Sequence, residues 1–179
     1  MLQNDPKMGE DISLAIAVSR GDQLAMDTVY RKYAPQILTI CRRYASEKEE
    51  ALDLLHDGFI RVFEKIGTYR AQSPLGIWVK RVVVNHAINT LKAKIKWEEL
   101  GEDLPDLPEE ELEENEAADP ETVLALIQEL PNGYRIVLNL YVFEELSHEE
   151  IAEKLGISAV SSRTQLFKAR RLLKKLWKH

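Results

Sequence analysis

Cysteine is almost absent from the sequence, since Cys41 is the only one among 179 residues. This excludes an internal disulfide and any zinc site built from several cysteines, and the apolar neighbours of Cys41 predict a buried thiol. Long apolar runs are also missing: residues 12–18, the longest such run near the N-terminus, are far too short to span a bilayer. Because the N-terminal stretch MLQNDPKMGED lacks the apolar segment of a signal peptide, we expect a cytoplasmic protein.

Motifs for nucleotide binding and catalysis are missing as well. The sequence contains no phosphate-binding GxxxxGK loop, no GxGxxG turn and no HExxH metal motif. Asp53 and Asp57 are spaced as neighbours on a helix, but without a second acidic pair we interpret them as part of an exposed face. The histidines are not spaced as a metal-binding set and are interpreted as surface residues: His56, His86, His148 and His179. We therefore predict no cofactor, no metal site and no enzymatic activity.

Basic residues are absent from one segment of the chain. Residues 98–121 carry 13 acidic and no basic side chains, whereas residues 1–97 have a net charge of +4 and residues 122–179 a net charge of +3. With three prolines among its acids, the segment 98–121 buries too little apolar surface to fold alone. We predict a flexible acidic linker between two mildly basic domains, so the overall charge of −6 does not exclude nucleic acid as a partner. The linker could mask the basic domains, lie in a nucleic-acid channel, or serve only as a solvated spacer.

Alternating strand patterns do not occur, and apolar residues recur instead at helical spacing. The pattern predicts an all-α fold with a helical bundle in residues 1–97. We expect an interruption at Gly21 and a kink or restart of the next helix at Pro35. Further helices are predicted over residues 52–66, 78–91, 123–130 and 134–142, with Trp78 in the core.

The C-terminal region has the pattern of a helix-turn-helix. Ser147 and Glu150 match a capping box, Gly156 suits the end of that helix, and Ser158 suits the start of the next one. Ala152 is the small residue expected where two helices cross closely.

The second helix of this motif has one apolar face and one basic face. Residues 163–178 contain seven basic side chains and no acidic one, a composition that fits the DNA major groove. A charge run alone indicates only a solvated helix face, but the capped turn and the inward apolar pattern favour DNA binding. The residues predicted to face DNA are Ser161, Arg163, Thr164, Phe167, Lys168 and Arg171, opposite an inward face of Ser162, Leu166, Ala169, Leu173 and Leu176.

Four segments of the chain share a pattern with known proteins: DTVYRKYAP (27–35), ALDLLHDGFIRVFEK (51–65), WVKRVVVNHAIN (78–89) and the region from Leu130 to Arg170. In this order they resemble bacterial sigma factors of the sigma-70 family, in the small two-domain extracytoplasmic function (ECF) group. No single segment is decisive, but the ordered set is highly specific and spans nearly the whole chain.

The resemblance implies a division of labour between the two domains. Residues 1–97 would bind core RNA polymerase and the −10 promoter element, and residues 122–179 would bind the −35 element. Polymerase contacts are implied for Asp53, His56, Asp57, Arg61 and Glu64, and −10 contacts for Lys80, Arg81, Asn85 and Asn89. Asn85 and the loop from Arg70 to Gly76 would form a pocket for a base taken out of the stack. An anti-sigma protein is a further implied partner, and the polymerase would supply the chemistry.

Some residues depart from the family pattern. His56 and Asp57 stand where a Gln-Glu pair is common, and Gly58 within a helix costs about 1 kcal/mol relative to alanine. A stand-alone helix-turn-helix regulator with an N-terminal sensing or dimerisation domain is the alternative, and a helical protein adaptor is a third. The ordered match across both domains favours the sigma factor.

Overall fold

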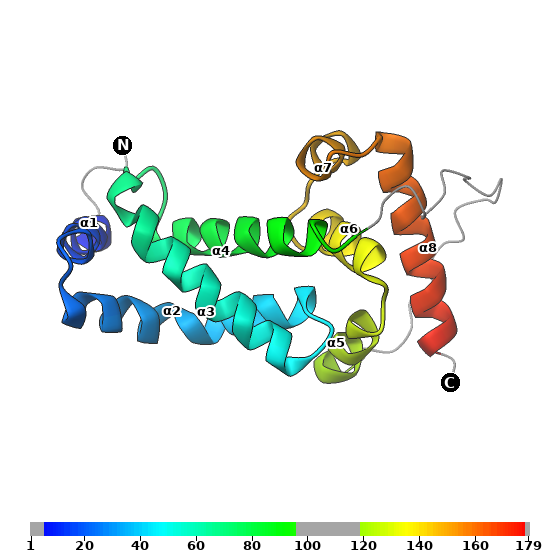
Figure 1. The fold of residues 1–179 in the computed structure, drawn as a ribbon, viewed down its shortest axis with the longest axis horizontal. Coiled ribbons are helices and arrows are strands. Elements are labelled where there is room, and N and C mark those ends of the chain that lie inside the picture. The colour runs from blue at the N-terminus through cyan, green and yellow to red at the C-terminus, as the bar shows by residue number, and fades with distance from the viewer. Residues whose placement is uncertain (1–5, 96–118, 178–179) are drawn as a thin grey trace. The chain divides into compact units, whose positions relative to one another are not determined.

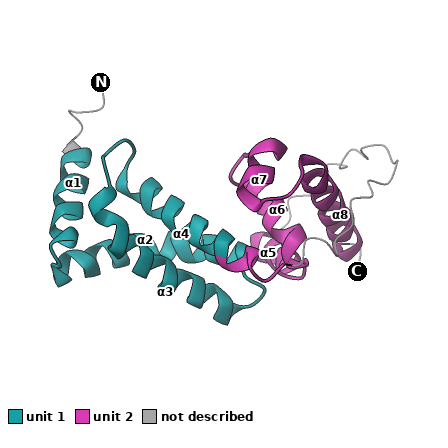
Figure 2. Ribbon diagram, turned by 45° about the horizontal axis from the view of Figure 1, so that its top comes forward, with its two compact units in different colours: residues 1–89 teal, residues 90–179 magenta. Residues whose placement is uncertain are grey.

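The computed structural model describes residues 6–95 and 119–177 (Figure 1). In these two ranges the chain forms eight α-helices and one short 3-10 turn, with no strand, so the predicted all-α class is confirmed. The chain divides into two compact units, residues 1–89 and residues 90–179 (Figure 2). No helix in the described ranges has the length and apolar character needed to cross a membrane.

The first unit begins with α1 (Pro6–Ser19) and α2 (Gln23–Tyr44), which meet at the predicted interruption. Gly21 has a φ of 85°, a left-handed conformation that glycine adopts without steric cost. Asp22 caps α2, because its carboxylate accepts hydrogen bonds from the backbone N–H groups of Leu24 at 2.9 Å and Ala25 at 3.1 Å. The expected break at Gly21 is therefore confirmed.

Of the two outcomes expected at Pro35, a kink or a restart, the restart is wrong, because α2 runs without a break from Gln23 to Tyr44. Proline lacks a backbone N–H, so one intrahelical hydrogen bond is missing at this position. Pro35 lies on the exposed side of the helix, where water can bind the carbonyl left without a donor. The opposite side of α2 is buried and packs along α3, which keeps the helix continuous.

Helices α3 (Lys48–Lys65) and α4 (Leu75–Lys92) complete the first unit, with the 3-10 turn η1 (Ile66–Thr68) between them. Gly58 lies where α4 approaches α3. A Cβ atom at this position would stand 2.6 Å from Cγ1 of Val83, which is buried in α4. This close approach explains why glycine stands inside α3, where helix propensity alone predicts only a cost.

Asp11 of α1 ties the start of α4 into the unit. Its carboxylate is buried and accepts a hydrogen bond of 2.8 Å from the backbone N–H of Leu75, the first residue of α4. In the loop before α4, the Tyr69 hydroxyl donates to the carbonyl of Ser73 at 2.8 Å. The Tyr69 ring meets the ring of Trp78 edge-on at 5.9 Å, so Trp78 is packed on one side but only half-buried.

The second unit contains α5 (Pro120–Gln128), α6 (Asn132–Val142), α7 (His148–Leu155) and α8 (Ala159–Trp177). Asp119 caps α5 by accepting the N–H of Thr122 at 3.1 Å, and Pro120 occupies the first helical turn, where its missing N–H has no cost. The last residues of the predicted linker 98–121 therefore belong to a helix. The rest of that linker lies outside the described residues.

A buried arginine closes the end of α5. Nη1 of Arg135 donates to the carbonyls of Gln128 at 2.8 Å and Leu130 at 2.9 Å, and Nη2 donates to the side chain of Asn132. The last carbonyls of a helix lack intrahelical donors, so this cation satisfies them and complements the helix dipole. The apolar core of the second unit is built from all four helices: Ile127, Leu130, Ile136, Leu140, Ile151, Leu155, Leu166 and Ala169.

Candidate nucleic-acid and protein interfaces

The turn between α7 and α8 has the local chemistry expected from the sequence. Ser147 and Glu150 form a capping box, with the Ser147 N–H donating to Glu150 at 2.8 Å and the Glu150 N–H donating to the Ser147 hydroxyl at 3.2 Å. The Ser147 hydroxyl also donates to the Glu150 carboxylate at 2.8 Å. The bond from the Ser147 backbone N–H and, to a smaller extent, the bond from its hydroxyl lower the pKa of Glu150. Gly156 ends α7 with a φ of 71°, and the Ser161 N–H donates to the Ser158 hydroxyl at 2.9 Å. The predicted caps are thus confirmed.

The first turn of α7 makes two side-chain contacts with α8. Nδ1 of His148 lies 2.8 Å from the Ser162 hydroxyl, and Nη2 of Arg163 donates to Glu149 at 2.7 Å. His148 is half-buried and stacks on the ring of Tyr141 at 4.8 Å, so its expected place on the surface is wrong. Burial chiefly lowers the pKa of His148, and the Arg163 charge lowers it further, while Glu149 opposes both effects.

The outward face of α8 is basic, as the sequence predicts. Arg163, Arg171, Lys174 and Lys175 are exposed, and Ser161, Phe167 and Lys168 are half-buried. Three residues of the predicted inward face are buried, namely Ser162, Leu166 and Ala169, whereas Leu173 and Leu176 are half-buried nearer the end of the helix.

Thr164 is the exception on this helix. It was expected on the outward face but is fully buried, and its hydroxyl donates to the carbonyl of Val160 at 3.0 Å. This bond to the preceding turn satisfies the hydroxyl within the helix, so the side chain does not project toward solvent. The neighbouring Gln165 is also buried, which the helical-wheel analysis missed.

The polar residues predicted on α3 lie together on one exposed face. Asp53, His56, Asp57, Arg61 and Glu64 are all exposed, and Arg61 pairs with Glu64 at 2.8 Å. Ile60 lies among them with 54% of its surface exposed. Sequence reasoning passed over Ile60, although an apolar residue off the buried stripe was a readable signal.

Three of the four residues predicted on α4 form an exposed row. Arg81, Asn85 and Asn89 recur at four-residue intervals and are exposed, whereas Lys80 is half-buried. His86, beside Asn85, was expected on the surface but is half-buried, with Nε2 at 4.0 Å from a carboxylate oxygen of Asp57 on α3. Burial lowers the pKa of His86, Asp57 opposes the shift, and Arg61 adds to it.

The loop before α4 contributes to two separate hollows. A cleft of about 540 Å³ is lined by residues of α1, α2 and the start of α4, including Asp11, Lys32, Tyr33, Pro74 and Lys80. A smaller hollow of about 310 Å³ lies between α1 and residues 66–71. Neither hollow is lined by Asn85, so the structure does not bring Asn85 and the loop together in either of them.

A metal centre finds no support in the described ranges. No group of three His, Cys, Asp or Glu side chains there could hold an ion. Cys41 is buried, and burial raises the pKa of its thiol to about 12. The groups available for binding in the described ranges are exposed charged, amide and apolar side chains on helix faces.

Comparison with known proteins identifies the family of the chain. Residues 29–96 match the family described as sigma-70 region 2, and residues 121–173 match sigma-70, region 4. The chain is 30% identical over 181 aligned residues to RNA polymerase sigma-H factor of Pseudomonas aeruginosa, with 93% of each protein covered. It is 27% identical over 178 aligned residues to the ECF RNA polymerase sigma-E factor of Haemophilus influenzae, covering 91% of this chain and 93% of that protein.

A solved structure shares the fold. It is the co-crystal structure of the sigma factor RpoE in complex with the anti-sigma factor NepR from Bartonella quintana. Its TM-score is 0.51 at 16% sequence identity, with 85% of this chain and 96% of that chain covered.

The chain therefore belongs to the sigma-70 family of RNA polymerase sigma factors. Within that family it is a sigma factor of the ECF group, as the ordered sequence segments predicted.

Proposed function

We propose that this chain binds core RNA polymerase through the exposed face of α3 and directs it to promoters through α4 and α8. Two findings that agree with each other support the proposal. The matches to sigma-70 regions 2 and 4 come in the predicted order, and the contact residues predicted from sequence lie mostly exposed on the helices concerned. Membership of the sigma-70 family disfavours the stand-alone regulator.

The α3 face has the composition of a protein interface. Stable interfaces place an apolar anchor among polar groups that exclude water from it. Ile60 supplies that anchor, and Asp53, His56, Asp57, Arg61 and Glu64 form the polar surroundings. We infer that Ile60 contributes to polymerase binding together with the five polar residues.

The exposed row on α4 has the chemistry of a DNA reader. The Asn85 and Asn89 side chains each carry amide donors and an acceptor that match base edges, and Arg81 carries a charge that attracts phosphate. We propose that this row, with Lys80, reads the −10 element.

The outward face of α8 supports reading of the −35 element in the major groove. Arg163 and Arg171 can pair with guanine or phosphate, Lys168 with phosphate, and Phe167 can lie against a thymine methyl. Ser161 stands at the helix N-terminus, where backbone N–H groups favour a phosphate. Thr164 is left out of this set because it is buried.

The cellular location and the partners of the chain follow from the same proposal. We propose that it acts in the cytoplasm and that the polymerase supplies the catalytic chemistry. The family resemblance also predicts an anti-sigma protein that would compete with polymerase.

The experiment mixes the purified chain with bacterial core polymerase, followed by gel filtration and transcription from a genomic fragment library. We expect co-elution and discrete new start sites that share −10 and −35 elements. Absence of a complex, with duplex DNA bound by the chain alone, would establish the regulator instead.

Variants on α3 locate the polymerase contact. Ile60→Asp and Arg61→Ala should weaken co-elution at least about tenfold, as expected for residues that carry interface energy. Arg31→Ala is the matched control, because Arg31 is also an exposed arginine in a local ion pair, at 2.8 Å from Asp27 on α2. Equal loss in Arg31→Ala and Arg61→Ala would remove α3 from the proposal.

A further inference from the structure

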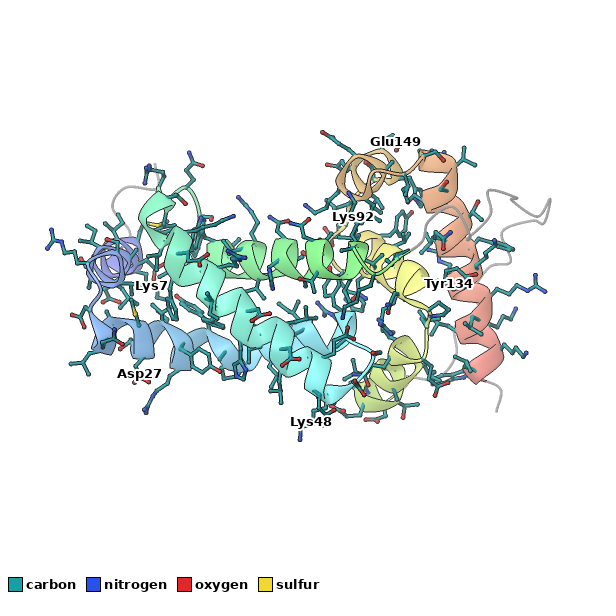
Figure 3. The ribbon with its side chains drawn as sticks, viewed as in Figure 1. Lys7, Asp27, Lys48, Lys92, Tyr134 and Glu149 are labelled. Carbon is teal, nitrogen blue, oxygen red and sulfur yellow. The ribbon has the colours of Figure 1, made fainter. Side chains whose placement is uncertain are left out.

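Arg163 of α8 is held by a partner outside the proposed DNA-binding set. Nη2 of Arg163 donates to Oε1 of Glu149 at 2.7 Å, and Glu149 stands at the start of α7 (Figure 3). The neighbouring residues His148 and Ser162 are also in contact at 2.8 Å, and Ser162 is fully buried. The first turn of α7 therefore contacts two successive residues of α8, which orients the start of the recognition helix.

The Glu149–Arg163 pair contributes little to folding. Both side chains are about half exposed, at 67% and 46%. Ion pairs in such positions typically contribute about 0–1 kcal/mol to stability. The pair instead fixes the direction of the Arg163 side chain and partly neutralises its positive charge.

That restriction changes what Arg163 can bind. One of its five N–H donors is taken by Glu149, and the remaining donors can still reach neutral acceptors on a base edge. A phosphate that approaches Arg163 meets the negative carboxylate of Glu149 at the same time, and like charges at this range repel. The pair therefore disfavours the sequence-independent contact more than the sequence-reading contact.

We propose that Glu149 is a specificity-determining residue of the −35 reader, which positions Arg163 for a base edge and suppresses its contact with phosphate. This inference rests on the proposed reading of the −35 element by α8. It assigns to α7 an electrostatic role in selectivity in addition to its role in the fold.

The test measures binding of the complete polymerase holoenzyme to two promoter duplexes over a range of salt concentrations. One duplex carries the −35 element found by start-site mapping, and the other carries that element scrambled. Glu149→Gln should increase affinity for the scrambled duplex and steepen its log–log salt slope by about 0.9, the value for one additional phosphate contact. The preference for the intact element should fall about tenfold, the scale of one lost base contact.

Glu153→Gln is the matched control. It makes the same chemical change at an exposed position one helical turn further along α7. The inference would be overturned if Glu149→Gln and Glu153→Gln changed the salt slope and the preference for the intact −35 element equally. Only the general charge of α7 would then matter.

A double-mutant cycle tests whether Glu149 acts through Arg163. In an Arg163→Gln background, Glu149→Gln should leave the preference and the salt slope unchanged, and a full effect there would contradict the inference. Wild-type holoenzyme that does not distinguish the two duplexes would refute the proposed −35 reading itself. Discrimination by wild type that survives in Glu149→Gln would refute only the role of Glu149.

Discussion

The carboxylate of Asp11 accepts a hydrogen bond of 2.8 Å from the backbone N–H of Leu75, although the two residues are 64 positions apart. A helix N-terminus needs acceptors for its first N–H groups, and most helices obtain one from the residue just before them. Here α1 supplies the acceptor, so the start of α4 depends on the packing of α1.

Asp11→Ala should therefore destabilise the first unit by about 1–2 kcal/mol, the cost of losing a helix cap whose backbone donor is buried. Amide hydrogen exchange should show the loss of protection in α1 and in the first turn of α4. Glu10→Ala, at the neighbouring exposed position, is the control and should change protection little. Unchanged exchange in Asp11→Ala would mean that the bond adds nothing to the fold.

Gly58→Ala should destabilise the first unit although alanine is the better helix former. Alanine gains about 1 kcal/mol in helix propensity. Its Cβ would stand 2.6 Å from Val83, whose β-branched side chain is stiff and buried, and such overpacking costs about 1–3 kcal/mol. Urea unfolding followed by circular dichroism measures the difference.

Gly9→Ala provides the contrast for this prediction. Gly9 lies within α1, and a Cβ there would meet nothing within 4 Å. This variant should gain up to about 1 kcal/mol. Stabilisation of similar size in Gly58→Ala would show that α4 adjusts without cost.

Arg135→Met should destabilise the second unit by about 2–4 kcal/mol. Methionine retains much of the apolar stem but removes the donor of the buried Leu130 carbonyl and of the half-buried Gln128 carbonyl. A buried unsatisfied group costs about 1–3 kcal/mol, and a half-buried one costs less because water can reach it. Hydrogen exchange in α5 and α6 is the measurement. Arg171→Met, on the exposed face of α8, should stay within about 0.5 kcal/mol.

The stability of the second unit should fall as the pH drops below about 6.5. The pKa of His148 is lowered in the folded chain, so the unfolded chain binds the proton more readily in the window between the folded pKa and the ordinary value. The contribution of neutral His148 to the stability of the second unit is complete above that window. It is lost as the pH falls through the pKa of His148 in the folded chain.

His148→Gln should flatten this dependence of stability on pH below about pH 6.5, measured as hydrogen exchange of α7 and α8. The pH window for His148 lies above the window for Glu150. Because the pKa of Glu150 is lowered, its contribution to stability is lost only below about pH 4.5. His56→Gln, on the exposed face of α3, controls for removal of a histidine. If the pH dependence of stability persists in His148→Gln, other titrating groups cause it.

Local features were predictable because the groups that make them lie within a few residues of each other. The capping box of Ser147 and Glu150, the left-handed Gly156 and the Ser158 cap each form between near neighbours, so residue type at fixed spacing determines them. The helical stripes follow from periodicity for the same reason. The family also followed from sequence, because its motifs occur in order along the chain.

Packing between helices decided the rest. No spacing rule connects Asp11 to Leu75, Gly58 to Val83 or Glu149 to Arg163, because each pair meets only when two helices are brought together. Thr164 was mispredicted for the same reason. A helical wheel gives the direction of a side chain from the helix axis, but it does not show how much of the helix surface is covered by neighbouring elements. The sequence by itself determined where helices start, stop and carry charge. The tertiary structure alone decided which side chains meet across them, because those contacts depend on crossing geometry that no local pattern encodes.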